Sequence, residues 1–217
     1  MVQKNARAQA GKPGLTTGKR GRGRPRGYDP DVALRRALET FWSLGYSGTS
    51  LDDLSAAMGM NRPSLYAAFG DKQALYLKAL ESYWAEALEA MRQLLARDEP
   101  LAEALMRIYD AALSLYFPLD GVPRGCFGIS TAAVESVAEP RIRAAFASGL
   151  RRIDKAFERR ITLAIERGEL PASADPRTLA EIASAILHTL AIRSRYGANR
   201  KELRGLAERT VRHLLRT

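Results

Sequence analysis

The stretch "GTSLDDLSAAMGMNRPSLYAAFGDKQALY", residues 48–76, decides how this chain folds. Ser50 and Asp53 have the spacing of a capping box, which predicts the start of a short helix. Gly59 breaks that helix, and a second short helix should start near Asn61. Two short helices joined by a tight turn that contains glycine are typical of a helix-turn-helix.

The second short helix combines two apolar positions with a small, polar outer surface. Leu65 and Phe69 should face the core. The outward side chains are small enough for the helix to enter a major groove about 12 Å wide. The side chains that can reach bases or phosphates are Asn61, Arg62, Ser64, Tyr66 and, at the start of the next helix, Lys72. Ala67 and Ala68 keep the outer surface small. The same spacing also fits an ordinary helical corner with a solvated face, so both interpretations stay open.

Helical periodicity continues on both sides of this motif. Asp29 followed by Pro30 is a helix start signal, because Asp caps free backbone donors and proline lacks one. No stretch alternates with the β-branched enrichment of a strand. The expected helices span residues 30–44, 51–58, 61–69, 72–95, 101–115, 125–137, 140–165, 176–190 and 203–215. The sequence therefore predicts an all-α fold of about nine helices.

The predicted organisation has three parts. Residues 28–75 should form the helix-turn-helix head, and residues 76–217 a larger helical domain. Residues 1–27 are rich in Gly, Lys and Arg and lack hydrophobic periodicity, so we expect a disordered basic arm. The helix expected over residues 72–95 would be about 35 Å long and would join the head to the larger domain.

Composition argues against several classes of protein. The chain has 217 residues and a net charge of +10. No run approaches the roughly 20 apolar residues of a membrane-spanning helix, and no signal peptide is visible. Cys126 is the single cysteine, which fits a reducing cytoplasm. His188 and His213 are far apart, and metal-ligand clusters, phosphate-binding glycine loops and nucleophile elbows are absent. We therefore expect no enzymatic activity, no cofactor and no metal.

The residues around the motif also match a known family. The segments "LGYSGTSLDDLSAAMGM" (44–60) and "LYAAFGDKQAL" (65–75) closely resemble the DNA-binding head of the tetracycline-repressor (TetR) family of bacterial transcriptional regulators. The match runs from about Tyr28 to Tyr83. Beyond it, the resemblance is one of helix number and order.

The resemblance implies roles for individual residues. Thr49 and Ser50 would contact phosphate at the N-terminus of the first short helix. Where the family often has two large residues and a glycine, this chain has Ala67, Ala68 and Pro63, and these departures bear on base preference rather than on fold. The full set of implied contacts is Thr49, Ser50, Asn61, Arg62, Pro63, Ser64, Tyr66, Ala67 and Lys72.

The basic arm adds a second candidate contact with DNA. Residues 1–27 contain eight Lys and Arg and no acidic residue, so the rest of the chain carries only +2. The sequence "RGRP" at residues 22–25 resembles the core of an AT-hook, in which an extended segment lies in the minor groove. A narrow minor groove concentrates negative potential and attracts arginine. Arg22, Arg24 and Arg26 are therefore candidate minor-groove contacts, with nonspecific attraction or a solubilising tail as alternatives.

In the family that the chain resembles, the larger helical domain binds a small molecule and forms the dimer. The candidate ligand contacts are Trp84, Leu88, Met91, Tyr109, Leu113, Tyr116, Phe127, Ser130, Thr131, Phe146, Ile153 and His188. The candidate dimer contacts are Leu179, Ile182, Ala183, Ile186, Leu190, Leu206, Val211 and Leu214. Each set also has the composition of an ordinary core, so both interpretations stay open here.

The implied function is that of a cytoplasmic homodimeric repressor, which binds a palindromic operator in double-stranded DNA and is released by an unidentified apolar or aromatic effector. The alternative is a constitutive architectural protein that binds AT-rich DNA, since an AT-hook-like arm needs no sensor. A separate hypothesis makes Cys126 a redox sensor whose thiol pKa is lowered by Arg124. A lone buried cysteine is more often a small core residue.

Overall fold

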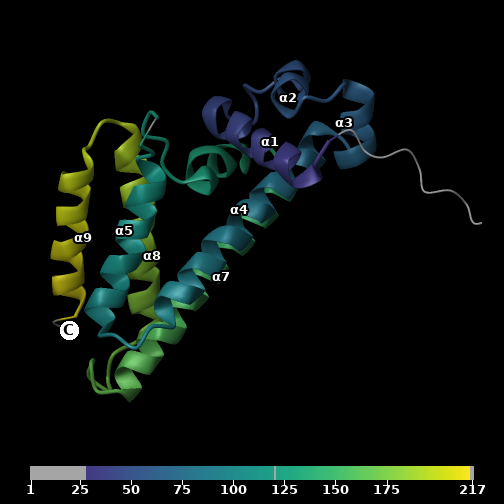
Figure 1. Ribbon diagram of the computed structural model, residues 1–217. Coiled ribbons are helices and arrows are strands. Elements are labelled where there is room, and N and C mark those ends of the chain that lie inside the picture. The colour runs from purple at the N-terminus through teal and green to yellow at the C-terminus, as the bar shows by residue number, and fades with distance from the viewer. Residues whose placement is uncertain (1–27, 120, 216–217) are drawn as a thin grey trace, which may run out of the picture.

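The structure, a computed structural model, describes residues 28–119 and 121–215. Over these residues it consists of nine α-helices and one π-helical turn, without a strand. The head helices α1–α3 lie at one end (Figure 1), and α4 runs from them alongside α7 toward α5, α8 and α9. The predicted all-α fold is confirmed. The predicted arm, with its AT-hook-like segment at residues 21–26, lies outside the described residues.

Capped helices form the head. They are α1 (Pro30–Leu44), α2 (Leu51–Met58) and α3 (Arg62–Phe69). The Asp29 carboxylate accepts from the backbone N–H of Asp31 at 2.8 Å, and Ser50 and Asp53 form the predicted capping box. Each cap satisfies backbone donors that the first turn of a helix leaves unpaired, so even the eight-residue α2 has a defined start.

The head has its own apolar centre. Phe41, Leu54 and Leu65, one from each of its helices, are fully buried. The Tyr28 ring packs on the Phe69 ring at the end of α3, with 6.4 Å between the ring centroids. Because a fully buried Leu or Phe side chain contributes about 1.5–3 kcal/mol by the hydrophobic effect, these contacts fix the orientation of α3 against α1 and α2.

The long helix α4 (Lys72–Leu95) begins at the predicted residue and ends where the apolar stripe ends. The carboxylate of Asp71 caps it by accepting from the N–H of Ala74 at 2.7 Å. Leu75, at its start, is fully buried against the head, and Met91, near its end, is buried in the larger part of the molecule. Helix α4 therefore joins the head to the larger part of the molecule.

Four further long helices form the larger part of the molecule. They are α5 (Leu101–Tyr116), α7 (Pro140–Glu166), α8 (Pro176–Arg195) and α9 (Arg200–Leu214). Helix α7 lies against both α4 and α8, whereas α9 packs on α5 and α8. No helix within the described residues is long and apolar enough to cross a membrane.

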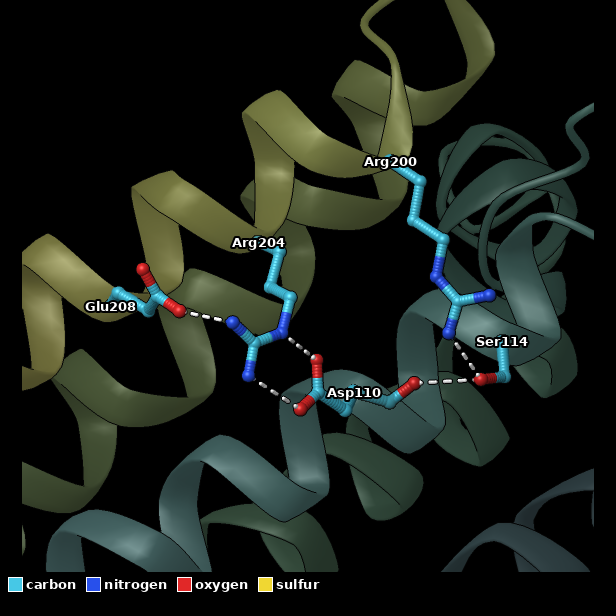
Figure 2. A network of polar contacts seen from close by, with 5 residues as sticks. All are labelled: Asp110, Ser114, Arg200, Arg204 and Glu208. Atoms are coloured by element: carbon cyan, nitrogen blue, oxygen red, sulfur yellow. Dashed lines mark hydrogen bonds and ion pairs between the residues drawn. The ribbon is translucent and has the colours of Figure 1, made fainter.

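Helix α9 is attached to α5 by polar contacts as well as by its apolar stripe (Figure 2). Arg204 forks onto the carboxylate of Asp110 at 2.8 and 3.2 Å and also contacts Glu208 on its own helix. Arg200 donates to the Ser114 hydroxyl at 2.7 Å, and that hydroxyl donates to the carbonyl of Asp110 at 2.9 Å. These exposed contacts set the register of α9 along α5.

The prediction of a sixth helix over residues 125–137 is wrong in its extent. A π-helical turn, η1 (Gly128–Ala132), is followed by one α-helical turn, α6 (Ala133–Glu135). Gly125 has φ +66, a conformation that stops an α-helix from starting there. Gly128 packs so closely on the Trp84 indole that a Cβ would lie 2.6 Å from Cζ2. The wider π turn accommodates this close approach, which apolar periodicity does not reveal.

An aromatic cluster joins the head to the rest of the molecule. Trp42 of α1 packs on Tyr83 of α4 at 5.3 Å and on Phe127 at 5.6 Å, measured between ring centroids. Tyr76 packs on the same Phe127 ring, and its hydroxyl lies 2.6 Å from that of Thr131. The head and the larger part of the molecule therefore share one continuous core.

Candidate DNA-binding surface and internal cavity

The turn between α2 and α3 has the geometry of a helix-turn-helix. Gly59 adopts the left-handed conformation with φ 65 and ψ 33, which residues with a side chain rarely adopt. The N–H of Met60 donates to the carbonyl of Ser55 at 3.0 Å and closes the end of α2. The carboxamide oxygen of Asn61 then caps α3 by accepting from the N–H of Ser64 at 2.9 Å. The chain thereby turns within three residues and presents α3 at the surface.

Helix α3 has an inner and an outer face, as predicted. Leu65 and Phe69 are buried, and the Tyr66 ring on the opposite side is 46% exposed. Asn61, Arg62, Pro63 and Ala67 are also exposed, and Ser64 is half-buried. The outer face therefore carries one guanidinium, one phenol and small side chains, and no carboxylate belongs to it. Such a surface can approach the floor of a major groove.

The guanidinium of Arg62 is held by a neighbouring helix. Its Nε donates to Asp52 Oδ1 at 3.0 Å and its Nη2 to Oδ2 at 2.7 Å, and both side chains are exposed. The carboxylate raises the pKa of Arg62 above its ordinary value. This fork leaves the Nη1 edge facing outward, so Asp52 orients Arg62 without removing it from the surface. Sequence reasoning missed Asp52, since a residue ten positions away gives no local signal.

The implied phosphate contacts at the start of α2 have different surroundings. The Ser50 side chain is exposed, and its hydroxyl donates to Asp53 Oδ2 at 2.6 Å. Thr49 is only 1% exposed, and its hydroxyl donates to the carbonyl of Gly45 at 2.6 Å. The Thr49 side chain therefore closes the loop after α1 and does not reach the surface in this conformation.

Lys72 stands at the first position of α4, on the same side of the head. Its Nζ lies 4.6 Å from the centre of the Tyr46 ring. The pKa of Tyr46 is raised, mainly by burial and then by nearby carboxylates led by Glu139. The ring therefore stays uncharged at neutral pH and holds the ammonium group through a cation–π contact. The contact therefore positions the Lys72 ammonium group at the start of α4.

A cavity of about 140 Å³, partly open to solvent, lies between α4, α5, α7 and α8. Five of the candidate ligand contacts line it: Trp84, Met91, Tyr116, Ile153 and His188. The other seven lie elsewhere in the described core or in a separate groove: Leu88, Tyr109, Leu113, Phe127, Ser130, Thr131 and Phe146. Helical periodicity identifies inward-facing positions but does not distinguish a packed position from one that borders a gap.

Small residues create this space. Ala87 and Ala90 on α4 face Ala111 and Ala112 on α5 across the cavity. Methyl side chains at these four positions leave a volume that larger residues would fill. Sequence reasoning gave weight to aromatic residues and passed over the alanines, although their clustering on two adjacent helices was the available signal.

The cavity wall is apolar, with few polar groups. Tyr83 donates through its hydroxyl to Cys126 Sγ at 3.1 Å, and both side chains are buried. Burial lowers the pKa of His188, partly offset by Asp154, so its imidazole is neutral at pH 7. The indole Nε1 of Trp84 is buried and has no hydrogen-bond partner among the described residues. An apolar molecule with one or two polar atoms would match these walls.

The environment of Cys126 argues against the redox hypothesis. Burial raises the pKa of its thiol above the ordinary value, although Tyr83 opposes the shift. Arg124 does not act on the thiol as hypothesised. Its guanidinium lies 4.0 Å from the centre of the Trp42 indole ring and donates to Glu39 at 2.5 Å. Cys126 is therefore a protonated, buried residue of the cavity wall in this conformation.

Hydrogen bonds connect the segment beside the cavity to the head. Ser47, in the loop after α1, donates through its N–H and its hydroxyl to the two carboxylate oxygens of Glu135, at 3.2 and 2.9 Å. Gln73 of α4 donates to Glu139 at 2.7 Å. Because Ile129 of η1 lines the cavity, the short segment from η1 to α7 contacts both the cavity and the head.

The candidate dimer residues fall into two groups. Ile182 is 41% exposed, and Ile186 and Leu206 are partly exposed. The others are already buried within the chain: Leu179, Ala183, Leu190, Val211 and Leu214. Those five contribute to the core of α8 and α9, so surface for a partner remains at the first three.

The comparisons with known proteins agree with this geometry. Residues 33–79 match the family described as "Bacterial regulatory proteins, tetR family", and residues 102–210 match "Tetracyclin repressor-like, C-terminal domain". The HTH-type transcriptional repressor ComR of Escherichia coli (strain K12) is 32% identical over 194 residues, which cover 89% of this chain and 92% of ComR.

Two further relatives extend the comparison. The uncharacterized HTH-type transcriptional regulator YezE of Bacillus subtilis (strain 168) is 30% identical over 68% of this chain and 76% of its own length. A cysteine mutant of the TetR family transcriptional regulator CifR, solved with a 26-bp operator DNA, is 31% identical with a TM-score of 0.81, covering 87% of this chain and 98% of that one. The chain belongs to the TetR family and is a transcriptional regulator.

Proposed function

We propose that the protein is a homodimeric repressor that binds a palindromic operator through α3 and is released by a small apolar or aromatic effector. The observation that carries the proposal is the outer face of α3, on which Arg62 is oriented by a fork with Asp52 and is surrounded by small side chains. A regulator of this kind acts on the nucleoid, in the cytoplasm.

The proposed contacts with DNA divide into base readers and phosphate anchors. Arg62 suits guanine, whose two major-groove acceptors match a guanidinium. Tyr66, which is exposed on the same face, suits a thymine methyl group or the sugar-phosphate backbone. Lys72 and Ser50 suit phosphates at either edge of the groove. Arg22, Arg24 and Arg26 would add minor-groove contacts beside the operator.

Dimerisation supplies the second half-site. A two-fold pair would place its two α3 helices about 34 Å apart, one turn of B-DNA. Ile182 on α8 is exposed, and Ile186 on α8 and Leu206 on α9 are partly exposed, which favours these helices as the contact surface. Arg204 and Asp110 attach helix α9 to α5 (Figure 2), which supports a defined position of α9 within the contact surface.

The cavity supports an effector of modest size. An engineered apolar cavity of about 150 Å³ binds benzene, and the cavity here measures about 140 Å³. A ligand that presses on Ile129 or Trp84 would act on η1 and α4 together, and both contact the head. The ligand lowers the affinity of the protein for DNA only to the extent that the ligand binds one arrangement of η1 and α4 more tightly than another.

A direct experiment measures binding of the purified protein to DNA from upstream of its own gene by fluorescence anisotropy, against random DNA of equal length. We expect the upstream fragment to bind at least 100-fold more tightly and Arg62→Ala to remove most of that preference. Sedimentation at micromolar concentration should give a dimer. Equal affinity for both fragments, or a monomer, would contradict the proposal.

A constitutive architectural role is the second candidate, favoured by the "RGRP" segment of the arm. Footprinting separates the two functions. A single protected inverted repeat, which a small molecule releases, indicates the regulator. Protection dispersed over AT-rich DNA indicates the architectural protein. Removal of residues 1–26 should flatten the dependence of log K on log salt by about 0.9 for each phosphate that the arm neutralises.

A further inference from the structure

An open groove of about 780 Å³ runs between α4 and α7, separate from the internal cavity. We call it the α4–α7 groove, and no residue lines both spaces. From Ala85 to Ala96 it follows α4 for about 16 Å. Its apolar lining consists of Ala85, Leu88, Leu95, Ala96, Ala156 and Leu163. Candidate contact Leu88 belongs to this groove.

The groove is strongly basic. Its cationic residues are Arg92, Arg151, Arg152, Lys155, Arg159 and Arg160, and Glu89 is the one carboxylate in its lining. Arg152 also pairs with Glu81, and Lys155 with Glu158, both outside the lining. Glu89 is already occupied by Arg92, which forks onto it at 2.8 and 2.6 Å. Arg151 and Arg159 form no ion pair with a described residue and are exposed. The groove therefore presents positive charge that the chain does not neutralise.

Arg160 lines the groove and is almost completely buried, with a side chain that is 2% exposed. Its Nη2 donates to the carbonyl of Glu99 at 2.6 Å and lies 3.4 Å from Glu169 Oε1. Glu169 is shared, because its other oxygen accepts from the N–H of Leu101. The Nε and Nη1 atoms of Arg160 have no hydrogen-bond partner among the described residues.

Unsatisfied donors on a buried cation are rare, because removing a charged group from water is unfavourable unless its hydrogen bonds are replaced. Three of the five N–H donors of a guanidinium belong to Nε and Nη1. Both atoms are themselves buried, so an anion in the open groove would reach the exposed Arg151 and Arg159 at the rim and not these donors. Planar carboxylates match a guanidinium particularly well.

We propose that the α4–α7 groove binds a small amphipathic carboxylate. Arg151 and Arg159 at the rim hold the acid group, and the apolar strip formed by Leu88, Leu95 and their neighbours takes the hydrocarbon part. The occupant contacts the helix that leads to the head and the helix packed against it. This proposal does not depend on the proposed function, because binding of the carboxylate to the groove is measurable without DNA.

The test titrates the full-length protein with sodium octanoate by isothermal calorimetry, beside 1-octanol and sodium acetate. We expect one site for octanoate, at least tenfold tighter than for the neutral alcohol or the short acid, and weaker in high salt. The Arg151→Ala/Arg159→Ala variant should bind octanoate at least tenfold more weakly. The matched control, Arg209→Ala/Arg212→Ala, removes two exposed arginines of α9 and should bind as the parent does.

Three outcomes overturn the proposal. The first is no binding of octanoate, or equal binding of octanoate and octanol. The second is an equal decrease in affinity in the two double variants, which indicates nonspecific attraction. The third is that filling the internal cavity with Ala112→Phe abolishes binding while the Arg151→Ala/Arg159→Ala variant still binds.

Discussion

Replacing Gly149 by alanine tests how tightly the Trp84 indole is held beside the cavity. A Cβ at Gly149 would lie 2.2 Å from Cε2, 2.4 Å from Nε1 and 2.6 Å from Cδ2 of that ring. Carbon atoms in contact are about 3.5–4.0 Å apart, so the rigid indole must move by about 1 Å or more. A Cβ at Gly128 would lie 2.6 Å from Cζ2 of the same ring. The displaced indole can therefore move only toward the cavity that it lines.

Two effects of opposite sign determine the expected magnitude. Glycine to alanine inside a helix stabilises by about 1 kcal/mol through helix propensity, whereas overpacking a core costs about 1–3 kcal/mol. Since a whole aromatic ring must be displaced, we expect overpacking to dominate and the free energy of unfolding to fall by about 1–2 kcal/mol. Urea unfolding followed by circular dichroism measures this change.

The matched control is Gly205→Ala in α9, where the nearest atom to a new Cβ is the flexible end of Arg209 at 3.3 Å. This variant should gain about 1 kcal/mol. A double-mutant cycle between Gly149→Ala and Trp84→Leu should show a coupling of at least about 0.5 kcal/mol. If Gly149→Ala is stabilised as much as Gly205→Ala, the indole is not confined and the reasoning is wrong.

Three further predictions concern the head and the cavity. Asp52→Asn frees Arg62 from its fork, so anisotropy titrations should show tighter binding to random DNA and a smaller preference for the operator, with an unchanged melting temperature. Asn61→Ala removes the cap of α3 and should lower the free energy of unfolding by about 0.5–2 kcal/mol in urea. Because burial lowers the pKa of His188, the unfolded chain binds its proton first as the pH falls below 6.5. The parent should therefore lose more stability than His188→Gln between pH 7 and pH 5, and parallel curves would contradict this assignment.

The local signals of the sequence were sufficient for the long helices, for α2 and α3, and for the outer face of α3. Caps such as Asp29, Ser50 and Asp71 are local features, and they fix where α1, α2 and α4 begin. Apolar periodicity then identifies the buried side of each helix. The interpretation of Leu65 as a core residue followed from this reasoning alone.

Contacts between distant residues were beyond the same reasoning. The Thr49 hydroxyl is a candidate phosphate contact in the sequence, but the fold of the loop buries it. Ala183 and Leu190 read equally well as dimer or core residues, and packing against the chain's own helices decided for the core. The cavity arises from alanines on α4 and α5 that meet only in three dimensions.

The aromatic cluster at the junction has a consequence for engineering. Trp42 of the head interlocks with Tyr83 and Phe127 of the larger domain, and Phe41 of the head packs on Tyr76. A chimaera made by grafting residues 28–75 onto the sensor of another regulator would separate these rings and leave mismatched aromatic faces. Modular exchange of specificities in this protein therefore requires that the cluster be transplanted as a whole.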